Sequence, residues 1–283
     1  MFNFEGRNEC INALNEVWED FRQQVSKVEY TTEELERAKE HVFLKTLDDV
    51  LHYEDNMERL AVSFTTLRLN YIFSRATKLT EAESKSHIDL SRFLPMDKFI
   101  EDDNRFSPKR VEYLYLGSKF NIYSTKNYRN IEKLCLKEIR SEKGNIVGHC
   151  RFEIREYLYG KHVANTDYKV IDLSLWDNYS FEEIQNELST MDFTDDNLKS
   201  NLNKLLFKLY IRLLSSELFK PVENVDGEKR YTPFHYLAYY FKSLGFQGII
   251  YKSTVHQRND VRNIVLFDKN FAVPTEYKVE VIR

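Results

Sequence analysis

Apolar residues in the first part of the chain recur at helical spacing. They return every three or four positions over residues 11–25, and a Thr-Thr-Glu-Glu capping signal at 31–34 opens the next helical stretch. Residues 57–76 are also rich in Leu, Val, Phe and Tyr, although at mixed spacing. We therefore predict a small unit of three helices over residues 8–76. The polar, charged stretch 80–89 marks its end.

The pattern changes from about residue 105 onwards, where short apolar runs of strand length alternate irregularly with helical stripes. Such irregular interleaving favours an α+β fold over a doubly wound parallel sheet. The predicted strands lie at 113–116, 150–154, 169–173, 248–251 and 264–267. The predicted helices lie at 131–139, 198–213 and 234–244, the last ended by a glycine.

These patterns divide the chain into a helical N-terminal unit, residues 1–90, and a second domain, residues 91–283. With 283 residues, each part is long enough to bury its own core. Only 8 glycines and 5 prolines are present, so long flexible linkers are not expected.

Charge and cysteine content narrow the function classes. The net charge of −4 argues against a protein that binds nucleic acid through a basic surface. Cys10, Cys135 and Cys150 have no metal-ligand spacing, so we expect reduced, buried thiols and no metal site. The N-terminus lacks the pattern of a secretory signal, and no apolar run reaches the roughly 18 residues of a membrane helix. We expect a cytoplasmic protein.

Several common catalytic motifs are absent from the sequence. No two glycines stand two positions apart, which excludes the G-x-G-x-x-G dinucleotide fingerprint. A phosphate-binding loop ending in Gly-Lys-Ser/Thr, an H-E-x-x-H helix and a G-x-S-x-G elbow are also missing. A nucleotide site in this chain must therefore be of another kind.

Two charged residues are candidates for such a site. Arg105 precedes a Pro-containing turn and an aromatic strand, from which a planar guanidinium can reach a pyrophosphate. A surface arginine in a charged stretch is the alternative. Glu138 lies near the end of the helical segment 131–139, where its carboxylate could share one cavity with Arg105 and Ser253. The alternative is a solvated glutamate on a helix face.

Three uncharged polar residues complete the candidate set. Tyr115 can offer a flat face and a hydroxyl, or be a core tyrosine. Ser253 stands at the end of a strand, where its hydroxyl can bond a carboxamide or phosphate, and a nucleophilic pair with His256 is the less favoured alternative. Asn263 can orient the substrate or cap a strand edge.

In their order along the chain, these segments resemble the RES domain family, which is named for its Arg, Glu and Ser. The resemblance covers roughly residues 100–275. It rests on the segments 105–108 and 113–116, the Cys-Leu-Lys-Glu at 135–138, the strand at 169–173, and the segments 245–253 and 263–267. It implies a fold similar to ADP-ribosyltransferases and an NAD pocket lined by Arg105, Tyr115, Glu138, Ser253 and Asn263.

The resemblance also implies an activity. Members of the family degrade NAD, and many are toxins paired with an antitoxin protein. We expect an NAD phosphorylase or glycohydrolase with NAD as substrate and no cofactor. Protein ADP-ribosylation, a non-catalytic interaction module, a phosphate acceptor and a homodimer stay open. The longer segment 119–130 leaves Tyr113 and Tyr123 as alternatives to Tyr115.

Overall fold

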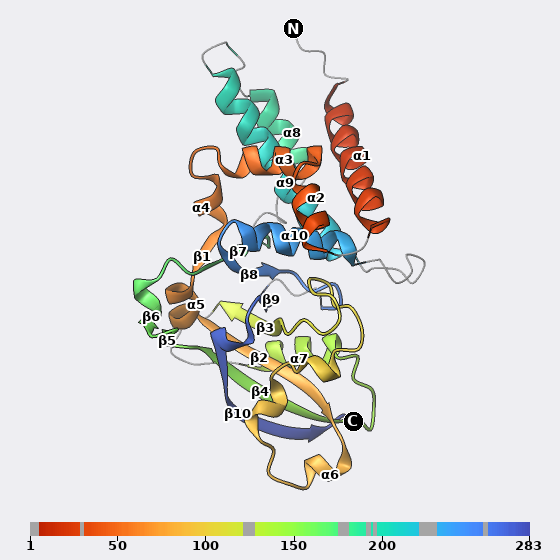
Figure 1. The fold of residues 1–283 in the computed structure, drawn as a ribbon, viewed down its shortest axis with the longest axis vertical. Helices are drawn as coiled ribbons and strands as arrows, with labels where there is room; N and C mark the ends of the chain where they lie inside the picture. Colours follow the sequence, from red (N-terminus) through yellow and green to blue (C-terminus); the bar gives the residue numbers. More distant parts are fainter. Residues whose placement is uncertain are drawn as a thin grey trace. The chain divides into compact units, whose positions relative to one another are not determined.

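The structure of the chain is a computed structural model that describes residues 6–28, 31–120, 128–174, 181–190, 194, 197–220, 231–256 and 260–283. These residues form two compact units (Figure 1). The first, called the helical unit below, comprises Met1–Ala61 and Leu173–Tyr240. The second, called the sheet unit, comprises Val62–Asp172 and Phe241–Arg283.

The helical unit joins helices from two distant parts of the sequence around one aromatic core. Phe43 packs on Trp18 and Phe21 with ring centroids 5.0 and 5.3 Å apart, and on Tyr210 at 5.4 Å. Its helices are α1 (Gly6–Ser26), α2 (Thr32–Lys39), α3 (Val42–Leu51), α4 (Asn56–Leu60), α8 (Phe181–Thr190), α9 (Leu198–Phe219) and α10 (Thr232–Ser243) as far as Tyr240.

The sheet unit is built on an eight-stranded sheet with the order β1-β7-β8-β9-β3-β2-β4-β10. β7 and β8 run parallel, and the neighbouring pairs from β8 to β10 run antiparallel. The strands are β1 (Ala61–Ser63), β2 (Tyr71–Leu79), β3 (Leu114–Phe120), β4 (Ile146–Ile154), β7 (Lys169–Asp172), β8 (Phe246–Tyr251), β9 (Arg262–Leu266) and β10 (Ala272–Val281). The predicted α+β class is thereby confirmed.

Short elements connect these strands. They are α5 (Phe64–Asn70), α6 (Glu81–Ser84), the 3-10 turns η1 (Leu90–Phe93), η2 (Asp97–Phe99), η3 (Val163–Asn165) and η5 (Lys269–Phe271), and the hairpin of β5 (Tyr157–Leu158) with β6 (Lys161–His162). One longer helix, α7 (Arg129–Glu138), also belongs to this unit.

The sheet opens between β2 and β3. Residues 71–74 of β2 pair with β3, and this pairing ends where Ser74 faces Gly117. From there β2 continues along β4 to Leu79, whereas β3 continues along β9 to Leu114. The two strands therefore lose their mutual pairing after Ser74 and Gly117, which leaves room for a cavity.

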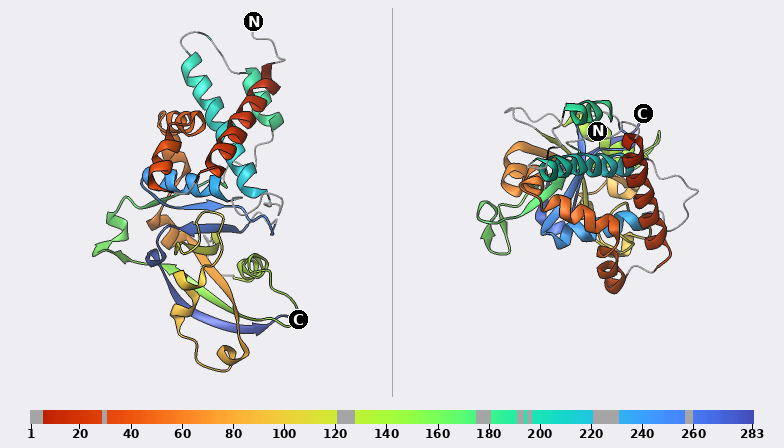
Figure 2. Two further views of the ribbon diagram at one scale, coloured as in Figure 1. Left: turned by 45° about the vertical axis from the view of Figure 1, so that its right-hand side comes forward. Right: turned by 90° about the horizontal axis from the view of Figure 1, so that it is seen from above.

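Helix α7 packs on the sheet at this opening (Figures 1 and 2). Its buried residues Ile131 and Cys135 cluster with Ile72 of β2. Gly117 permits the close approach, since a Cβ atom there would lie 2.8 Å from Cys135 Sγ and 2.9 Å from Ile131 Cγ2. This packing fixes the end of α7, and with it Glu138, beside the opening.

Most of the predicted elements after residue 105 are confirmed. The predicted strands correspond to β3, β4, β7, β8 and β9, and the predicted helices to α7, α9 and α10. The prediction of one helix over 57–76 is wrong at residues 61–63, which form β1, and beyond Asn70, because residues 71–79 form β2. The aromatic and β-branched side chains of this segment suit a pleated, buried strand.

The compact units also differ from the division predicted at residue 90. β2 is an inner strand of the sheet, and α9 packs on α3 in the helical unit. Patterns along the sequence do not record such long-range pairing. In the described part of the chain, no helix has the length and apolar character needed to cross a membrane.

Candidate functional site

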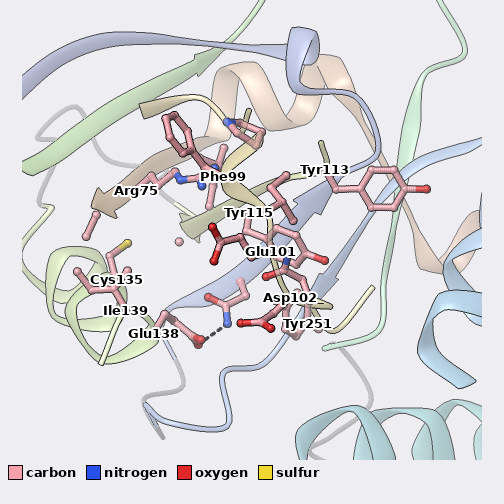
Figure 3. A pocket seen from close by; sticks show the side chains of 17 residues that line it. Arg75, Phe99, Glu101, Asp102, Tyr113, Tyr115, Cys135, Glu138, Ile139 and Tyr251 are labelled. Carbon is pink, nitrogen blue, oxygen red and sulfur yellow. Dashed lines mark hydrogen bonds between the residues drawn. The ribbon is translucent and has the colours of Figure 1, made fainter. Parts of the chain in front are cut away.

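A cavity of about 500 Å³ lies in the sheet unit at the opening between β2 and β3 (Figure 3). Its wall includes Arg75 of β2, Tyr115 and Gly117 of β3, Glu138 at the end of α7, and Asn263 of β9. We call it the Glu138 cavity. Its volume is within the range of ligand-binding pockets, roughly 300–1,000 Å³.

The Glu138 carboxylate is held by two hydrogen bonds to a single oxygen. Ser253 Oγ and Asn263 Nδ2 both donate to Oε1, each at 2.6 Å. Oε2 accepts no hydrogen bond from the residues that the structure describes, and Glu138 is exposed to solvent where it lines the cavity. Such hydrogen bonds to an ionised acceptor are the stronger kind. The arrangement orients one carboxylate oxygen and leaves the other exposed.

This anchoring offsets an unfavourable position. Glu138 is the last residue of α7, where the helix dipole and the last free carbonyl groups disfavour a negative charge. The two donors come from the sheet, since Asn263 belongs to β9 and Ser253 follows β8. Three segments that are distant in the sequence therefore combine to hold one carboxylate.

Ser253 acts as a donor and turn anchor in this structure. Its Oγ accepts the backbone N–H groups of Val255 at 3.2 Å and His256 at 3.1 Å, while its proton is given to Glu138. The contact shown between Ser253 and His256 is thus made by a backbone N–H group. The Ser253 hydroxyl thus gives its proton to a carboxylate and accepts two N–H groups on its oxygen. These bonds leave Ser253 poorly suited as a nucleophile.

Tyr115 lines the cavity with its ring and uses its hydroxyl elsewhere. The hydroxyl accepts the Phe106 N–H at 3.1 Å and bonds Ser107 Oγ at 3.1 Å. Burial raises its pKa far above the usual range. The hydroxyl therefore stays protonated and holds the turn that carries Arg105. Tyr113 also lines the cavity, whereas Tyr123 lies outside the described residues.

Arg105 does not occupy the predicted position on the cavity wall. It stands in a turn closed by two backbone hydrogen bonds between Asn104 and Ser107, at 2.9 and 3.3 Å. Phe106 beside it is buried against Tyr251, 5.0 Å between ring centroids. Arg105 lies close enough to Tyr115 to lower the pKa of the phenol slightly, which places it near the cavity but outside the described lining.

The guanidinium on the described wall comes from Arg75, which the sequence did not single out. Its Nη1 is buried and has no hydrogen-bond partner among the described residues. Burial lowers the pKa of Arg75 to about 10, so the group stays charged at neutral pH. A buried cation with an unused donor is costly unless an anion meets it. One signal was present in the sequence, namely a single arginine inside an aromatic, β-branched segment.

Two further carboxylates face the same cavity. Glu101 and Asp102, in the segment between η2 and β3, line it together with Glu138 (Figure 3). The described wall thus carries three carboxylates and one guanidinium. This balance makes the cavity negative, apart from the immediate surroundings of Arg75.

The thiol on the wall is not activated. Cys135 Sγ donates to the Ser74 carbonyl at 3.3 Å, and burial raises the pKa of the thiol to about 12. A thiol with that pKa carries almost no thiolate at neutral pH. Cys135 and Cys150 are both free and buried, and the side chain of Cys10 lies outside the described residues.

The comparisons with known proteins add no name to this geometry. No family model, no curated protein and no solved structure matches the chain. Across the described residues, no group of three or more His, Cys, Asp or Glu side chains is placed to hold a metal ion. The chemistry of the site is therefore argued from its own side chains.

Proposed function

We propose that the chain cleaves the bond between nicotinamide and ribose in NAD. The observation that carries this proposal is the Glu138 carboxylate, fixed through Oε1 and open at Oε2, in one cavity with the buried guanidinium of Arg75. The fixed Glu138 carboxylate suits a sugar that becomes cationic during the reaction. The Arg75 guanidinium in the same cavity suits a pyrophosphate on the same substrate.

Glu138 supplies the electrostatic part of catalysis. Breaking a glycosidic bond passes through an oxocarbenium-like state with positive charge on the sugar ring. A carboxylate that is oriented before the reaction stabilises this charge without reorganising. Oε2 meets this requirement because Ser253 and Asn263 occupy the other oxygen. Glu138 thus favours the transition state over the ground state.

Arg75 supplies binding at a distance from the reacting bond. Arg75 lines the cavity and its positive charge suits a pyrophosphate oxygen, so a bound pyrophosphate would compensate part of the cost of burying the guanidinium. Binding energy at the pyrophosphate holds the ribose against Glu138. Arg105, near Tyr115, is a second cation for the same group.

Support for a RES-type, ADP-ribosyltransferase-like sheet unit comes from the meeting of separate sequence segments. Of the residues that the family resemblance assigns to one NAD pocket, Tyr115, Glu138 and Asn263 line one cavity, and Ser253 is hydrogen-bonded to Glu138. The opening of the sheet between β2 and β3 supplies the space. An antitoxin partner and a homodimer stay predictions.

Water is the acceptor that the charge of the cavity favours. The three carboxylates of the cavity repel a phosphate dianion, and the one guanidinium on its described wall is already assigned to the pyrophosphate of NAD. In the hydrolysis, a water oxygen bonds to the ribose carbon as the carbon–nitrogen bond breaks. Nicotinamide leaves with the bonding electrons as a neutral molecule, and the water proton passes to solvent. The products are ADP-ribose, nicotinamide and one proton.

The test is nicotinamide release by the purified chain. Wild-type protein is given NAD, and nicotinamide and ADP-ribose are measured by chromatography with and without phosphate. Glu138→Gln keeps the shape and removes the charge, so we expect release to fall by about 10²- to 10³-fold. The matched control is Glu142→Gln, an exposed glutamate just beyond α7 that does not line the described cavity.

Three outcomes would contradict parts of the proposal. Equal rates in wild type and Glu138→Gln would remove Glu138 from the reaction. A phosphorylated ADP-ribose product that appears only with phosphate would show that phosphate, not water, is the acceptor. Absence of release from wild-type protein would favour an interaction module instead.

A further inference from the structure

A second cavity, of about 540 Å³, shares a wall with the first. The shared residue is Tyr113, which lines both. In Figure 3 its ring points away from the end of the cavity where Glu138 and Arg75 lie. We call this second space the outer cavity. It is formed within the sheet unit by residues from several segments, among them Tyr159, Lys242 and Phe267.

The outer cavity is rich in aromatic rings. Tyr113 packs on Phe267 with ring centroids 5.0 Å apart and an interplanar angle of 42°. Lys242 Nζ lies 5.8 Å from the centre of the Tyr113 ring. Burial raises the pKa of Tyr113 to about 12, so its hydroxyl stays neutral. The rings on the described wall are Tyr113, Tyr159, Tyr168, Phe267 and Phe271. Flat π-faces of this kind stack on planar heterocycles.

The charges of the outer cavity cancel. Its described wall carries two lysines and two carboxylates. Lys269 Nζ is paired with Glu112 at 2.6 Å, and the Asp268 carboxylate accepts the hydroxyl of Tyr159. The outer cavity therefore differs from the Glu138 cavity, which is negative. A wall that is neutral overall and rich in aromatic rings, of which Tyr159 is exposed, suits an uncharged planar ligand better than a phosphate.

We propose that the outer cavity binds the adenosine end of NAD. In this arrangement the bound NAD molecule passes from the Glu138 cavity into the outer cavity beside Tyr113. This inference rests on the proposed function. NAD is elongated, with nicotinamide and adenine at opposite ends of a pyrophosphate. When the nicotinamide ribose lies at Glu138 and the pyrophosphate lies near Arg75, the adenosine leaves the first cavity. The neighbouring ring-lined space receives it.

The proposal assigns a specificity role to Tyr159. Its side chain is 68% exposed, its ring meets Phe271 edge-on at 6.5 Å, and its hydroxyl bonds Asp268. An exposed ring on a hairpin is dispensable for folding, so its removal tests binding rather than stability. Tyr157, in the same hairpin and 62% exposed, does not line the described outer cavity and is the matched control.

The kinetic test compares NAD with nicotinamide mononucleotide, which lacks the adenosine. Tyr159→Ala should raise KM for NAD by about 5- to 150-fold, because stacking on one base is worth that order of affinity, and Lys242→Ala should raise it in the same direction. KM for the mononucleotide should not change in either variant. Tyr157→Ala should match wild type with both substrates. An unchanged ratio of the two KM values in Tyr159→Ala would overturn the proposal.

A binding test separates this inference from the proposed function. Saturation-transfer NMR with adenosine needs no cleavage. The adenine protons should receive saturation from wild-type protein and lose most of it in Tyr159→Ala. Adenosine binding without any nicotinamide release would contradict the proposed function and support the adenosine site. Nicotinamide release without adenosine binding would do the reverse.

Discussion

Both units of the molecule leave some buried polar atoms without a hydrogen-bond partner among the described residues, Trp18 Nε1 of the helical unit among them, but Arg75 of the sheet unit also lines a cavity. In the helical unit, Tyr240 donates to Asp48 Oδ1 at 2.9 Å, and Asn56 Nδ2 donates to the Val50 carbonyl at 2.8 Å. In the sheet unit, Arg75 has a buried donor without a partner among the described residues. Paired polar groups stabilise a fold, whereas an unpaired buried cation costs stability and gains its partner from a ligand. The cavity beside Arg75 is the reason why the proposed function is placed in the sheet unit.

The substitution Arg75→Met tests this comparison most strongly. Removing the buried charge should leave the free energy of unfolding unchanged or raise it, while kcat/KM for NAD falls about 10- to 100-fold. Urea unfolding and nicotinamide release measure the two effects. Lys78→Met, an exposed position on the same strand, is the control. A large loss of stability in Arg75→Met would show a structural role and remove the contrast.

In the helical unit we expect a smaller effect, which changes stability and leaves activity unchanged. Tyr240→Phe removes the hydroxyl that donates to Asp48, so the free energy of unfolding should fall by about 1 kcal/mol. Nicotinamide release by the folded variant should equal that of wild type. Chemical denaturation and the release assay test both statements. A drop in activity at full folding would extend the site into the helical unit.

The smallest effect that we expect is a pH dependence of stability that arises from His149 of β4. This residue is 3% exposed and its Nε2 lies 3.0 Å from Glu280 Oε1. Burial lowers the pKa of the imidazole, which outweighs the raising effect of Glu280. The unfolded chain therefore binds the proton more readily than the folded one. Stability from this group is present above the unfolded pKa of about 6.5 and is lost as the pH falls below it.

The measurement is urea unfolding at pH 7.5 and at pH 5.5. Wild type should lose more stability between these values than His149→Gln, which has no proton to bind at that position. Equal losses in the two proteins would contradict the direction given for His149.

Three of the residues that the sequence singled out meet in the structure. Glu138, Ser253 and Asn263 stand in short segments whose order resembles one family, and the structure joins their side chains by hydrogen bonds. The α7 stripe and the β8 and β9 runs are also strong local patterns. Local periodicity sufficed where each residue stands at the end of such an element.

Other features depended on pairing that no local pattern encodes. Arg75 was missed because β2 was read as the end of a helix, and its strand character depends on lying between β3 and β4. β10 was missed because it is an edge strand with mostly exposed side chains and a register shift after Pro274. Arg105 was expected on the wall, but the residue of its turn that lines the cavity is its neighbour Asn104.

The central claim is that Glu138 and Arg75 hold the same NAD molecule. The most direct measurement is a crystal structure of Glu138→Gln with NAD, because this variant should bind the substrate without turning it over. We predict the nicotinamide ribose in contact with residue 138 and a pyrophosphate oxygen hydrogen-bonded to the Arg75 guanidinium. NAD bound in another place, or an Arg75 side chain that does not touch it, would contradict the account.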